Sequence, residues 1–405
     1  MSAETRPSYP SWLPLLLGFL TATGPVSTDM YVPAFPSIEA DFGLPLGSAQ
    51  VTLAAWFFGL GLGQLTLGAL SDRFGRRTPL LVAIAIYTLT NAGCALAPDI
   101  ETLTAMRLIC AFAGAASMVI PIAVVRDLAT GYAATHMMSQ LILVRSIVPI
   151  IAPSIGSLLL TVASWRMIFW STMIYGGLCL LLVAFHLPDT LPVEQRVRQN
   201  AAGLARRYGA ILTEKVFLVH AAIYGGTMFI LFAFIGASPA VFIDGMGLSP
   251  RAFALVFSAC TVFYLIFSQL NTRFIRRFGA SRVMRGGIAI AFAATVILAI
   301  VAFAGAAFPG WLSWWMPMPP LMAMMGTQGF TIPNATIGGM HPHAANAGSA
   351  SALMGMIGFS CGGVSGLLAG TFSDGTARGM AGLMLFGTIC MVIADWRRRR
   401  MLAKG

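Results

Sequence analysis

The sequence predicts an all-α membrane protein whose twelve transmembrane helices form two pseudo-symmetric halves of six. The first observation is composition: hydrophobic residues make up 57% of the 405 residues and charged residues 10%, and the mean hydropathy is +0.81. A soluble domain carries about 25% charged residues, so this chain has too little charge to cover a surface in water. The other two observations are a series of bilayer-length apolar stretches and a basic motif that recurs half a chain later.

Apolar stretches long enough to cross a bilayer follow one another along the chain. A membrane-spanning helix needs about 20 apolar residues. We predict spans at residues 12–34, 47–70, 78–97, 102–125, 136–162, 166–187, 215–240, 250–272, 284–306, 311–336, 345–372 and 379–396. The first stretch is too long and too rich in proline for a cleaved signal peptide, so we expect it to remain as the first span.

Basic residues lie mostly on one side of the predicted bundle. Of the 25 Lys and Arg, twenty fall in alternate loops and the chain ends, three lie on the other side (Arg166, Arg251 and Arg378), and Arg107 and Arg145 lie within spans. The positive-inside rule therefore places both termini in the cytoplasm. This topology and the attraction of anionic lipid explain the net charge of +11, so no nucleic-acid partner is expected.

The longest polar stretch divides the chain in two. Residues 188–214 are predicted to be a cytoplasmic linker between an N-terminal half, 1–187, and a C-terminal half, 215–405, that ends in a basic tail. Arg73-Phe74-Gly75 follows span two, and Arg277-Phe278-Gly279 follows span eight, 204 residues later. An internal repeat of this kind is typical of transporters whose substrate site lies near the membrane midplane between the halves.

Asp29 is the only one of the 14 acidic residues that falls in the interior of a predicted span, since Asp395 stands at the cytoplasmic end of the last one. A charge inside the membrane is costly, so such a residue is a functional candidate. Counting 1.5 Å per residue, Asp29 in span one and Arg107 in span four lie at a similar level in the outer half. They could form a pair or compete for one cavity. Burial favours the neutral carboxyl and a nearby arginine favours the charged one, a balance that suits a proton-carrying switch. The alternative is a static ion pair that holds two helices.

Arg145 lies in the middle of span five and has no intramembrane acid of its own. It either lines a cavity as a cation or satisfies its charge by snorkelling or by bonding a backbone carbonyl. With Asp29 ionised, the three intramembrane charges sum to +1, which favours neutral or anionic substrates over a simple cationic drug. Other polar groups predicted to line the substrate cavity are Tyr31, Gln64, Tyr224, Gln328 and Asn334.

No motif in the sequence indicates an enzymatic activity or a bound cofactor. The sequence has no H-E-x-x-H, no phosphate-binding G-x-x-x-x-G-K-[ST] loop and no coherent Ser/His/Asp set. Its six cysteines form no C-x-x-C pair, so neither a zinc site nor a disulfide framework is indicated. We therefore expect a non-enzymatic protein without metal or cofactor.

The loop after span two, Gly68-Ala-Leu-Ser-Asp72-Arg73-Phe-Gly75-Arg76-Arg77, resembles the signature loop of the major facilitator superfamily. Further residues resemble the Bcr/CflA-type drug-resistance branch, which consists of drug:proton antiporters. They are Asp29-Met30-Tyr31-Val32-Pro33 in span one, Arg107 in span four, and Ala152-Pro153 with Gly156 in span five. The chain departs from the branch at Cys110, which stands where glutamine is common, and at Arg145, which stands where a small or apolar residue is common.

The resemblance implies the major facilitator fold and export of small drug-like molecules, of the multidrug or phenicol/bicyclomycin type, by alternating access. It places the protein in the bacterial inner membrane as a monomer, with a small-molecule substrate, protons and lipid as its partners. Asp29 would be the protonation site and Arg107 its partner. Asp72 would lie near the inner end of span eleven, and arginines of its loop would pair with Asp127.

The expected conformational switch combines the signature loop, its acidic partner and the proline-kinked span five. Its residues are Gly68, Asp72, Arg73, Gly75, Arg76, Arg77, Asp127, Pro149, Pro153 and Gly156. Two alternatives to drug export stay open. A proton-linked transporter of an anionic or neutral metabolite would explain Arg107 and Arg145. An intramembrane enzyme or receptor on a transporter-like scaffold would show ligand binding without flux.

Overall fold

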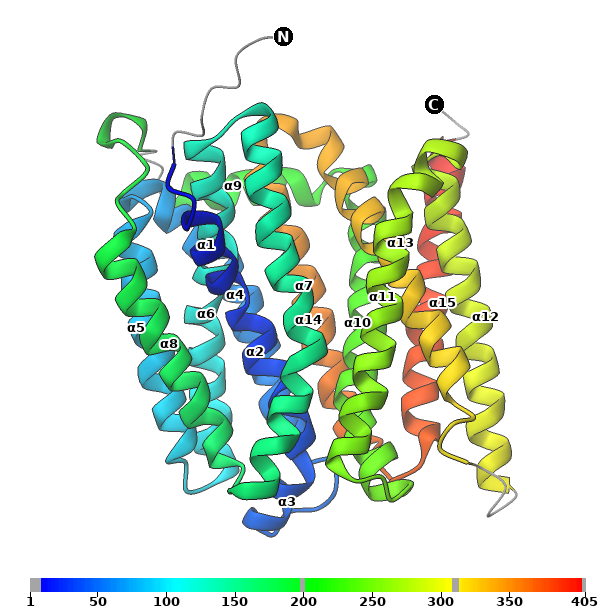
Figure 1. Ribbon diagram of the computed structural model, residues 1–405. Helices are drawn as coiled ribbons and strands as arrows, with labels where there is room; N and C mark the ends of the chain where they lie inside the picture. The colour runs from blue at the N-terminus through cyan, green and yellow to red at the C-terminus, as the bar shows by residue number, and fades with distance from the viewer. Residues whose placement is uncertain (1–8, 197–200, 308–312, 403–405) are drawn as a thin grey trace.

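The computed structural model describes residues 9–196, 201–307 and 313–402, and in these ranges the regular structure is entirely helical. Long helices stand side by side along one axis (Figure 1). Ten of them are long and apolar enough to cross a membrane. The first predicted span is also helical, as a broken series of short helices, and most of the predicted span 311–336 lies in a helix of 23 residues that begins at Met318. The predicted start of that span, residues 311–312, lies outside the described residues. The predicted fold class is confirmed.

The first predicted span, 12–34, is not one continuous helix. Its residues form α1 (Leu13–Thr21), α2 (Thr23–Asp29) and the 3-10 turn η1 (Val32–Ala34), after which α3 (Phe35–Phe42) extends the segment. Proline lacks the backbone N–H and clashes with the preceding turn, so the prolines along this segment account for the interruptions. The main break falls directly after Asp29.

The rest of the N-terminal half consists of long helices. They are α4 (Gln50–Phe74), α5 (Arg77–Ala95), α6 (Ile100–Leu128), α7 (Gly131–Val162) and α8 (Arg166–His186). Gly59 and Gly63 let α4 approach α6 closely, because a Cβ at either position would overlap a carbonyl of α6. This contact brings Trp56 of α4 against Arg107 of α6.

The linker predicted from its polarity contains the 3-10 turn η2 (Val193–Gln195) and the helix α9 (Ala201–Leu212), which the sequence reasoning did not anticipate. Tyr208 and Ile211 lie three residues apart on α9 and both turn toward the bundle. Ile211 is buried with residues of the C-terminal half, and the Tyr208 hydroxyl donates to the Leu65 carbonyl of α4 (2.8 Å). The linker helix thus contacts both halves.

The C-terminal half repeats the pattern of long helices. Its elements are α10 (Lys215–Pro239), the π-helical turn η3 (Ala240–Gly245), α11 (Pro250–Phe278), α12 (Ala280–Ala307), α13 (Met318–Met340), the 3-10 turn η4 (His341–Asn346), α14 (Ala347–Thr371) and α15 (Ala377–Leu402). The α4–α5 turn, α9, the α11–α12 turn and the end of α15 lie together at one end of the bundle, at the top of Figure 1. We call it the basic end.

Two helix pairs join the halves. Along α4 and α14, Ala54 lies against Gly366 and Gln64 against Gly355, so this contact runs well past the middle of the bundle. Between α7 and α11, the Ser258 hydroxyl donates to the Ile150 carbonyl (2.8 Å). From there α7 and α11 diverge toward the basic end (Figure 1).

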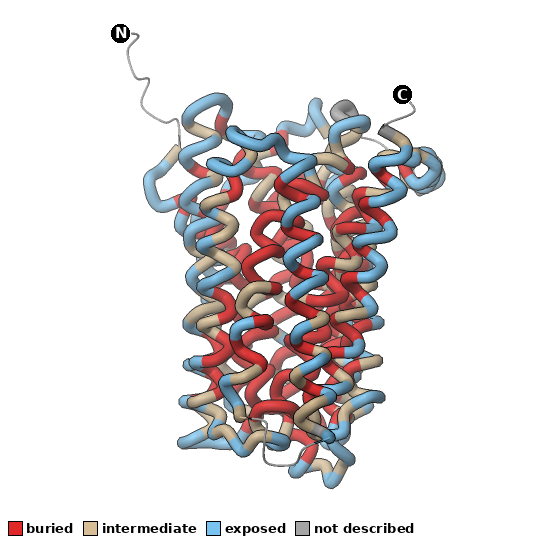
Figure 2. The backbone as a smooth tube through the Cα atoms, turned by 90° about the vertical axis from the view of Figure 1, so that its right-hand side faces the viewer, coloured by how far each residue is buried: buried red, intermediate tan, exposed pale blue. Residues whose placement is uncertain are grey.

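The outward surface is apolar, as expected for a protein surrounded by lipid. Figure 2 shows buried backbone concentrated in the interior of the bundle and exposed backbone on its outside and at its ends. Large hydrophobic side chains are among the most exposed, including Leu89 at 72% and Phe185 at 79%. Apolar surface on this scale is found where a protein meets a membrane or a partner.

Candidate functional site

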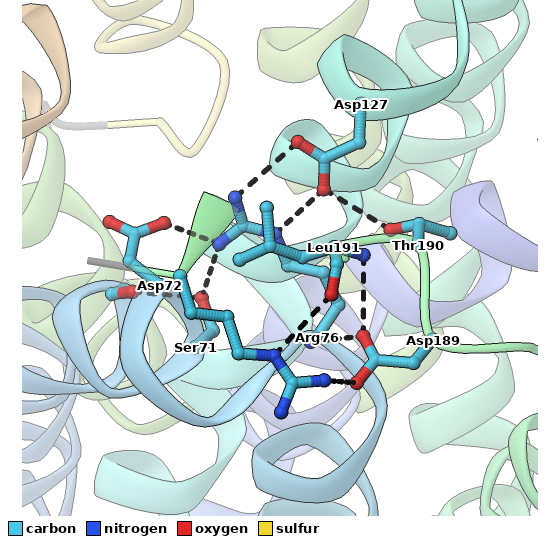
Figure 3. A network of polar contacts seen from close by, with 9 residues as sticks. Ser71, Asp72, Arg76, Asp127, Asp189, Thr190 and Leu191 are labelled. Atoms are coloured by element: carbon cyan, nitrogen blue, oxygen red, sulfur yellow. Dashed lines mark hydrogen bonds and ion pairs between the residues drawn. The ribbon is translucent and has the colours of Figure 1, made fainter. Parts of the chain in front are cut away.

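Arg76 of the α4–α5 turn is the centre of a polar network at the basic end (Figure 3). Its guanidinium donates to Asp127 of α6 through Nε (2.8 Å), to Ser71 through Nη1 (2.9 Å), and to Asp72. The Arg76 side chain is only 6% exposed. Burial alone would lower the pKa of Arg76, but the hydrogen bonds to Asp127 and Asp72 outweigh it and hold the pKa above its ordinary value. The structure thus forms the expected pair between a loop arginine and Asp127.

The start of the linker completes this network. Asp189 accepts from the Arg76 backbone N–H (2.8 Å) and from Arg196 (2.7 Å), while the Thr190 hydroxyl donates to Asp127 (3.1 Å). Sequence reasoning missed Asp189, Thr190 and Arg196, because no motif connects the linker to the α4–α5 turn. Their role follows only from the way the chain returns after α8.

Gly75 has φ +89°, and a Cβ there would overlap the Asp189 carboxylate. Both facts require glycine, since other residues avoid this backbone region and no side-chain atom fits. Of the other predicted switch residues, Gly68 lies against Val119, Arg73 against the Phe74 ring, and Arg77 donates to the Ala184 carbonyl (2.6 Å).

Asp72 was expected near the inner end of span eleven, which is the start of α14. Its side chain is 48% exposed, binds Arg76, and lies near enough to Tyr208 of α9 to act on it electrostatically. Among the described residues it has no hydrogen bond or ion pair to α14. The expected position of Asp72 near the start of α14 stays a prediction.

The break between α2 and η1 forms a second site, deep in the bundle. Asp29 is 7% exposed and has no hydrogen bond or ion pair among the described residues. The next residue, Met30, points its carbonyl at Gly156 of α7, where a Cβ would overlap it. Pro149 and Pro153 lie on the same helix, which continues through both prolines. The span-five motif thus packs directly against the residue that follows Asp29.

Arg107 of α6 is fully buried against the segment that carries Asp29, but it forms no ion pair with Asp29. Its Nη1 donates to the Ser27 carbonyl (3.1 Å), and its guanidinium lies over the rings of Trp56 (4.2 Å) and Tyr31 (4.5 Å). The Nε and Nη2 atoms have no partner among the described residues. Cation–π attraction therefore supplies much of its stabilisation. Of the two arrangements that the sequence left open, the ion pair with Asp29 is not formed in this state.

Cys110, one of the two departures from the family pattern, lies inside the N-terminal half. It is fully buried, and Asn91 of α5 donates to its sulfur (3.2 Å) while accepting from Thr172 of α8 (2.8 Å). Cys110 therefore takes part in helix packing among α5, α6 and α8.

The other predicted cavity residues have different surroundings. Tyr31 is fully buried against Arg107 and bonds the Thr52 hydroxyl, and Asn334 bonds Asn271 of α11 (2.9 Å). Gln328 is buried, with its Oε1 unpartnered. Gln64 is half-buried at the contact between α4 and α14.

Arg145 differs from all of these because it is exposed in mid-helix. It has no hydrogen bond or ion pair among the described residues. The groups on which it acts electrostatically are Tyr224 of α10 and Tyr264 of α11, both in the other half. Its surroundings therefore differ from those of the buried Arg107.

Residues 17–370 match the Major Facilitator Superfamily. The chain belongs to this family. It is 34% identical to an uncharacterised MFS-type transporter, YdgK, of Bacillus subtilis over 92% of this chain and 91% of that protein. It is 29% identical to a bicyclomycin resistance protein homolog of Haemophilus influenzae over 94% and 93% of the two chains, consistent with the drug-resistance branch.

A solved structure supports the same fold. A bacterial homolog of the human lysosomal transporter Spinster, in an inward-facing and occupied conformation, superposes with a TM-score of 0.72. The match covers 96% of each chain at 14% sequence identity, so it shows the fold alone. The family points to a multi-pass membrane transporter of small molecules rather than to an enzyme.

Proposed function

We propose that this transporter is a proton-coupled antiporter that exports small drug-like molecules from the bacterial cytoplasm by alternating access. The basic end would face the cytoplasm, because arginine-rich loops stay on that side of a membrane. The name of the Haemophilus influenzae relative supports a drug substrate. One chain carries both halves, so a monomer suffices.

The observation that carries the proposal is Asp29, a buried carboxyl that has no hydrogen bond or ion pair in the described part of the chain and lies directly before the break between α2 and η1. Without a partner, the neutral acid is the favoured form at this depth. Ionised Asp29 needs water or a cation for stabilisation. The guanidinium of Arg107 is a cation bound to the same segment, because it donates to the Ser27 carbonyl two residues earlier. Asp29 is thus suited to bind a proton in one state and release it in another.

The contact between Met30 and Gly156 could couple protonation of Asp29 to movement of α7. A change of charge at Asp29 alters the segment that lies directly against α7. In turn, α7 contacts α11 of the other half through Ile150 and Ser258. We expect protonation to bias this contact between the halves, while the Arg76 network keeps the basic end of the N-terminal half together.

The test is drug efflux in proteoliposomes with an imposed proton gradient, starting with bicyclomycin and chloramphenicol. Asp29→Asn should abolish coupling, because asparagine cannot ionise. Glu101→Gln, an exposed acid in the first turn of α6, is the matched control and should retain full coupling. Full coupling in Asp29→Asn would overturn the assignment of the proton site.

The same proteoliposomes test whether the protein exports or takes up its substrate. Export predicts that drug leaves the compartment facing the basic end as protons enter it. Accumulation of a metabolite in that compartment, driven by the same gradient, would instead favour the uptake function.

A further inference from the structure

A groove opens between α11 and α12 near the basic end of the C-terminal half (Figure 1), with a volume of about 270 Å³. Phe274 and Phe278 of α11 line one side, and Gly286 and Ile290 of α12 line the other. Both helices pack on α13, which contributes Phe330. This ring is buried and lies 5.4 Å from the ring of Phe274, so it forms the floor of the groove.

Gly286 keeps the α12 side of the groove open. A Cβ at Gly286 would meet no atom within 4 Å. Its neighbour Gly287 differs, because a Cβ there would press on Phe330 and Thr331 of α13. Close packing of α12 on α13 therefore explains Gly287 but not Gly286, whose missing side chain leaves space in the groove.

The groove follows α12 for nearly the depth of one lipid leaflet. Arg282 is the third residue of α12, and Ile290 lies eight residues further along, or about 12 Å. The hydrocarbon core of a bilayer is about 30 Å thick, so one leaflet accounts for about 15 Å. Phe274, Phe278 and Ile290 are exposed. The groove thus begins at the level of the basic loops and continues into the acyl-chain region, where lipid is the ligand within reach.

Positive charge gathers at the loop end of the groove. Arg282 is the only charged residue of the lining, and the guanidinium of Arg277 lies over the Phe278 ring (5.2 Å). Neither arginine has a hydrogen bond or an ion pair among the described residues. Asp395 of α15 does not neutralise them, because it binds two arginines of its own helix. At this end of α11, α12 and α15, nine arginines stand against that one aspartate.

The N-terminal half shows how the chain itself neutralises the equivalent turn. There, Asp127 and Asp189 both contact Arg76. In the second copy of the motif, 204 residues later, Arg276 stands at the position that Asp72 has in the first. The second turn therefore has an added positive charge where the first has an acid, and an anion from outside the chain would complement it.

We propose that the groove binds an anionic phospholipid, with the phosphate at Arg282 and Arg277 and one acyl chain along Phe274 and Ile290. Arginine suits a phosphate because its planar guanidinium donates two parallel hydrogen bonds. Basic pockets between membrane helices on the cytoplasmic side are typical sites for anionic headgroups. The proposal goes beyond the proposed transport function, since it depends on neither proton coupling nor the direction of transport.

Thermal unfolding tests lipid binding without requiring transport. Purified protein in a neutral detergent is titrated with phosphatidylglycerol, or with phosphatidylcholine that carries the same acyl chains, and stabilisation by each lipid reports its apparent affinity. We expect phosphatidylglycerol to bind about fivefold more tightly, as one arginine near an anionic headgroup requires. Inorganic phosphate at the same concentrations has the charge but no acyl chain and should not stabilise the protein.

Two variants separate the headgroup contact from the acyl-chain contact. Arg282→Gln should remove most of the preference for phosphatidylglycerol, whereas Arg126→Gln, an exposed arginine near the basic end of α6, should keep it. Gly286→Leu should fill the groove and weaken the binding of phosphatidylglycerol. Its control is Gly382→Leu in α15, where a Cβ would also meet nothing within 4 Å, and which should bind lipid as the parent does.

Both leucine variants replace a helical glycine at an open position, so both should fold. Equal losses of preference in Arg282→Gln and Arg126→Gln would mean that anionic lipid is attracted by the basic end as a whole, and the groove would not be the site. Unchanged lipid binding in Gly286→Leu, or equal stabilisation by inorganic phosphate, would also overturn the proposal. Native mass spectrometry tests another occupant: a dimer that Gly286→Leu dissociates would place a second copy of the chain in the groove instead of a lipid.

Discussion

The two halves hold their charged residues in different ways. In the N-terminal half, ion pairs join segments far apart in the chain, Arg76 with Asp127 and Arg166 with Asp41, in addition to the local pair of Arg76 with Asp72. In the C-terminal half, the pairs are local: Arg378 with Asp374, four residues apart, and Arg398 with Asp395, three apart. Ion pairs therefore fasten helices to one another in the first half, whereas in the second they mainly complete a single helix or turn.

The Arg-Phe-Gly motif occurs in both halves, and its two copies have the same backbone turn but different contacts. Gly75 and Gly279 follow the same Arg-Phe dipeptide, and both have positive φ, +89° and +82°. A Cβ at Gly75 would overlap Asp189, but at Gly279 it would meet nothing within 4 Å. The local sequence sets the backbone turn in both halves. The second turn is also joined to a distant helix, through the bond that Arg398 donates to Ser281. A Cβ at its glycine would meet nothing, however, whereas Gly75 and Arg76 contact Asp189 of the linker directly.

The largest expected effect is that of Asp127→Asn. It removes the more buried of the two carboxylates that compensate Arg76 and leaves only the half-exposed Asp72, so we expect a loss of about 3 kcal/mol, the low end of the range for breaking a buried ion pair. Arg277→Gln at the equivalent turn, where the described residues provide no ion pair, should stay within about 0.5 kcal/mol. Denaturant unfolding in mixed micelles measures both. Equal losses in the free energy of unfolding would mean that ion pairs do not hold the two turns differently.

Alanine at the two glycines comes next. Gly75→Ala and Gly279→Ala should both cost about 1 to 3 kcal/mol of backbone strain. Gly75→Ala should cost more, because Asp189 must also move and release Arg76 and Arg196. The difference between the melting temperatures of the two variants measures the contribution of the Asp189 contact apart from that of backbone strain. A vanishing difference would show that Asp189 adjusts freely.

Arg398→Gln should have a smaller effect than Asp127→Asn. It removes the bonds to Asp395 and to Ser281 of α12, but Arg399 still pairs with Asp395 (3.2 Å). We expect a loss of about 2 kcal/mol, as for a buried group that keeps one of its partners. The double variant Arg398→Gln, Arg399→Gln should lose clearly more. If it does not, Arg399 is no substitute partner.

The smallest effect concerns pH. The hydrogen bonds that Arg166 and then Trp165 donate to Asp41 hold the pKa of its carboxyl below the ordinary value. Its stabilisation is therefore present above about pH 4 and is lost as the pH falls further. Because the pair is exposed, we expect less than about 1 kcal/mol. Melting between pH 6 and pH 3 should show a smaller decline for Asp41→Asn than for the parent.

Much of the fold could be predicted because a bilayer imposes simple rules. Apolar stretches must be about 20 residues long, and basic loops gather on one side. These rules gave the helical spans and the single acid in their interior, Asp29. These rules did not predict that the first span is broken after Asp29 or that the linker contains the helix α9, because neither feature changes the length or the polarity of its segment.

By itself, the sequence determined which residues are exceptional: an acid and two arginines in apolar stretches, and glycines at tight turns. Only the tertiary structure decided what surrounds them. Arg107 is buried against the ring of Trp56, while Arg145 is exposed in mid-helix and has no hydrogen bond or ion pair among the described residues. The physical reason is that a charge in a membrane is costly wherever it stands in the sequence, but its partners come from helices far away in the chain.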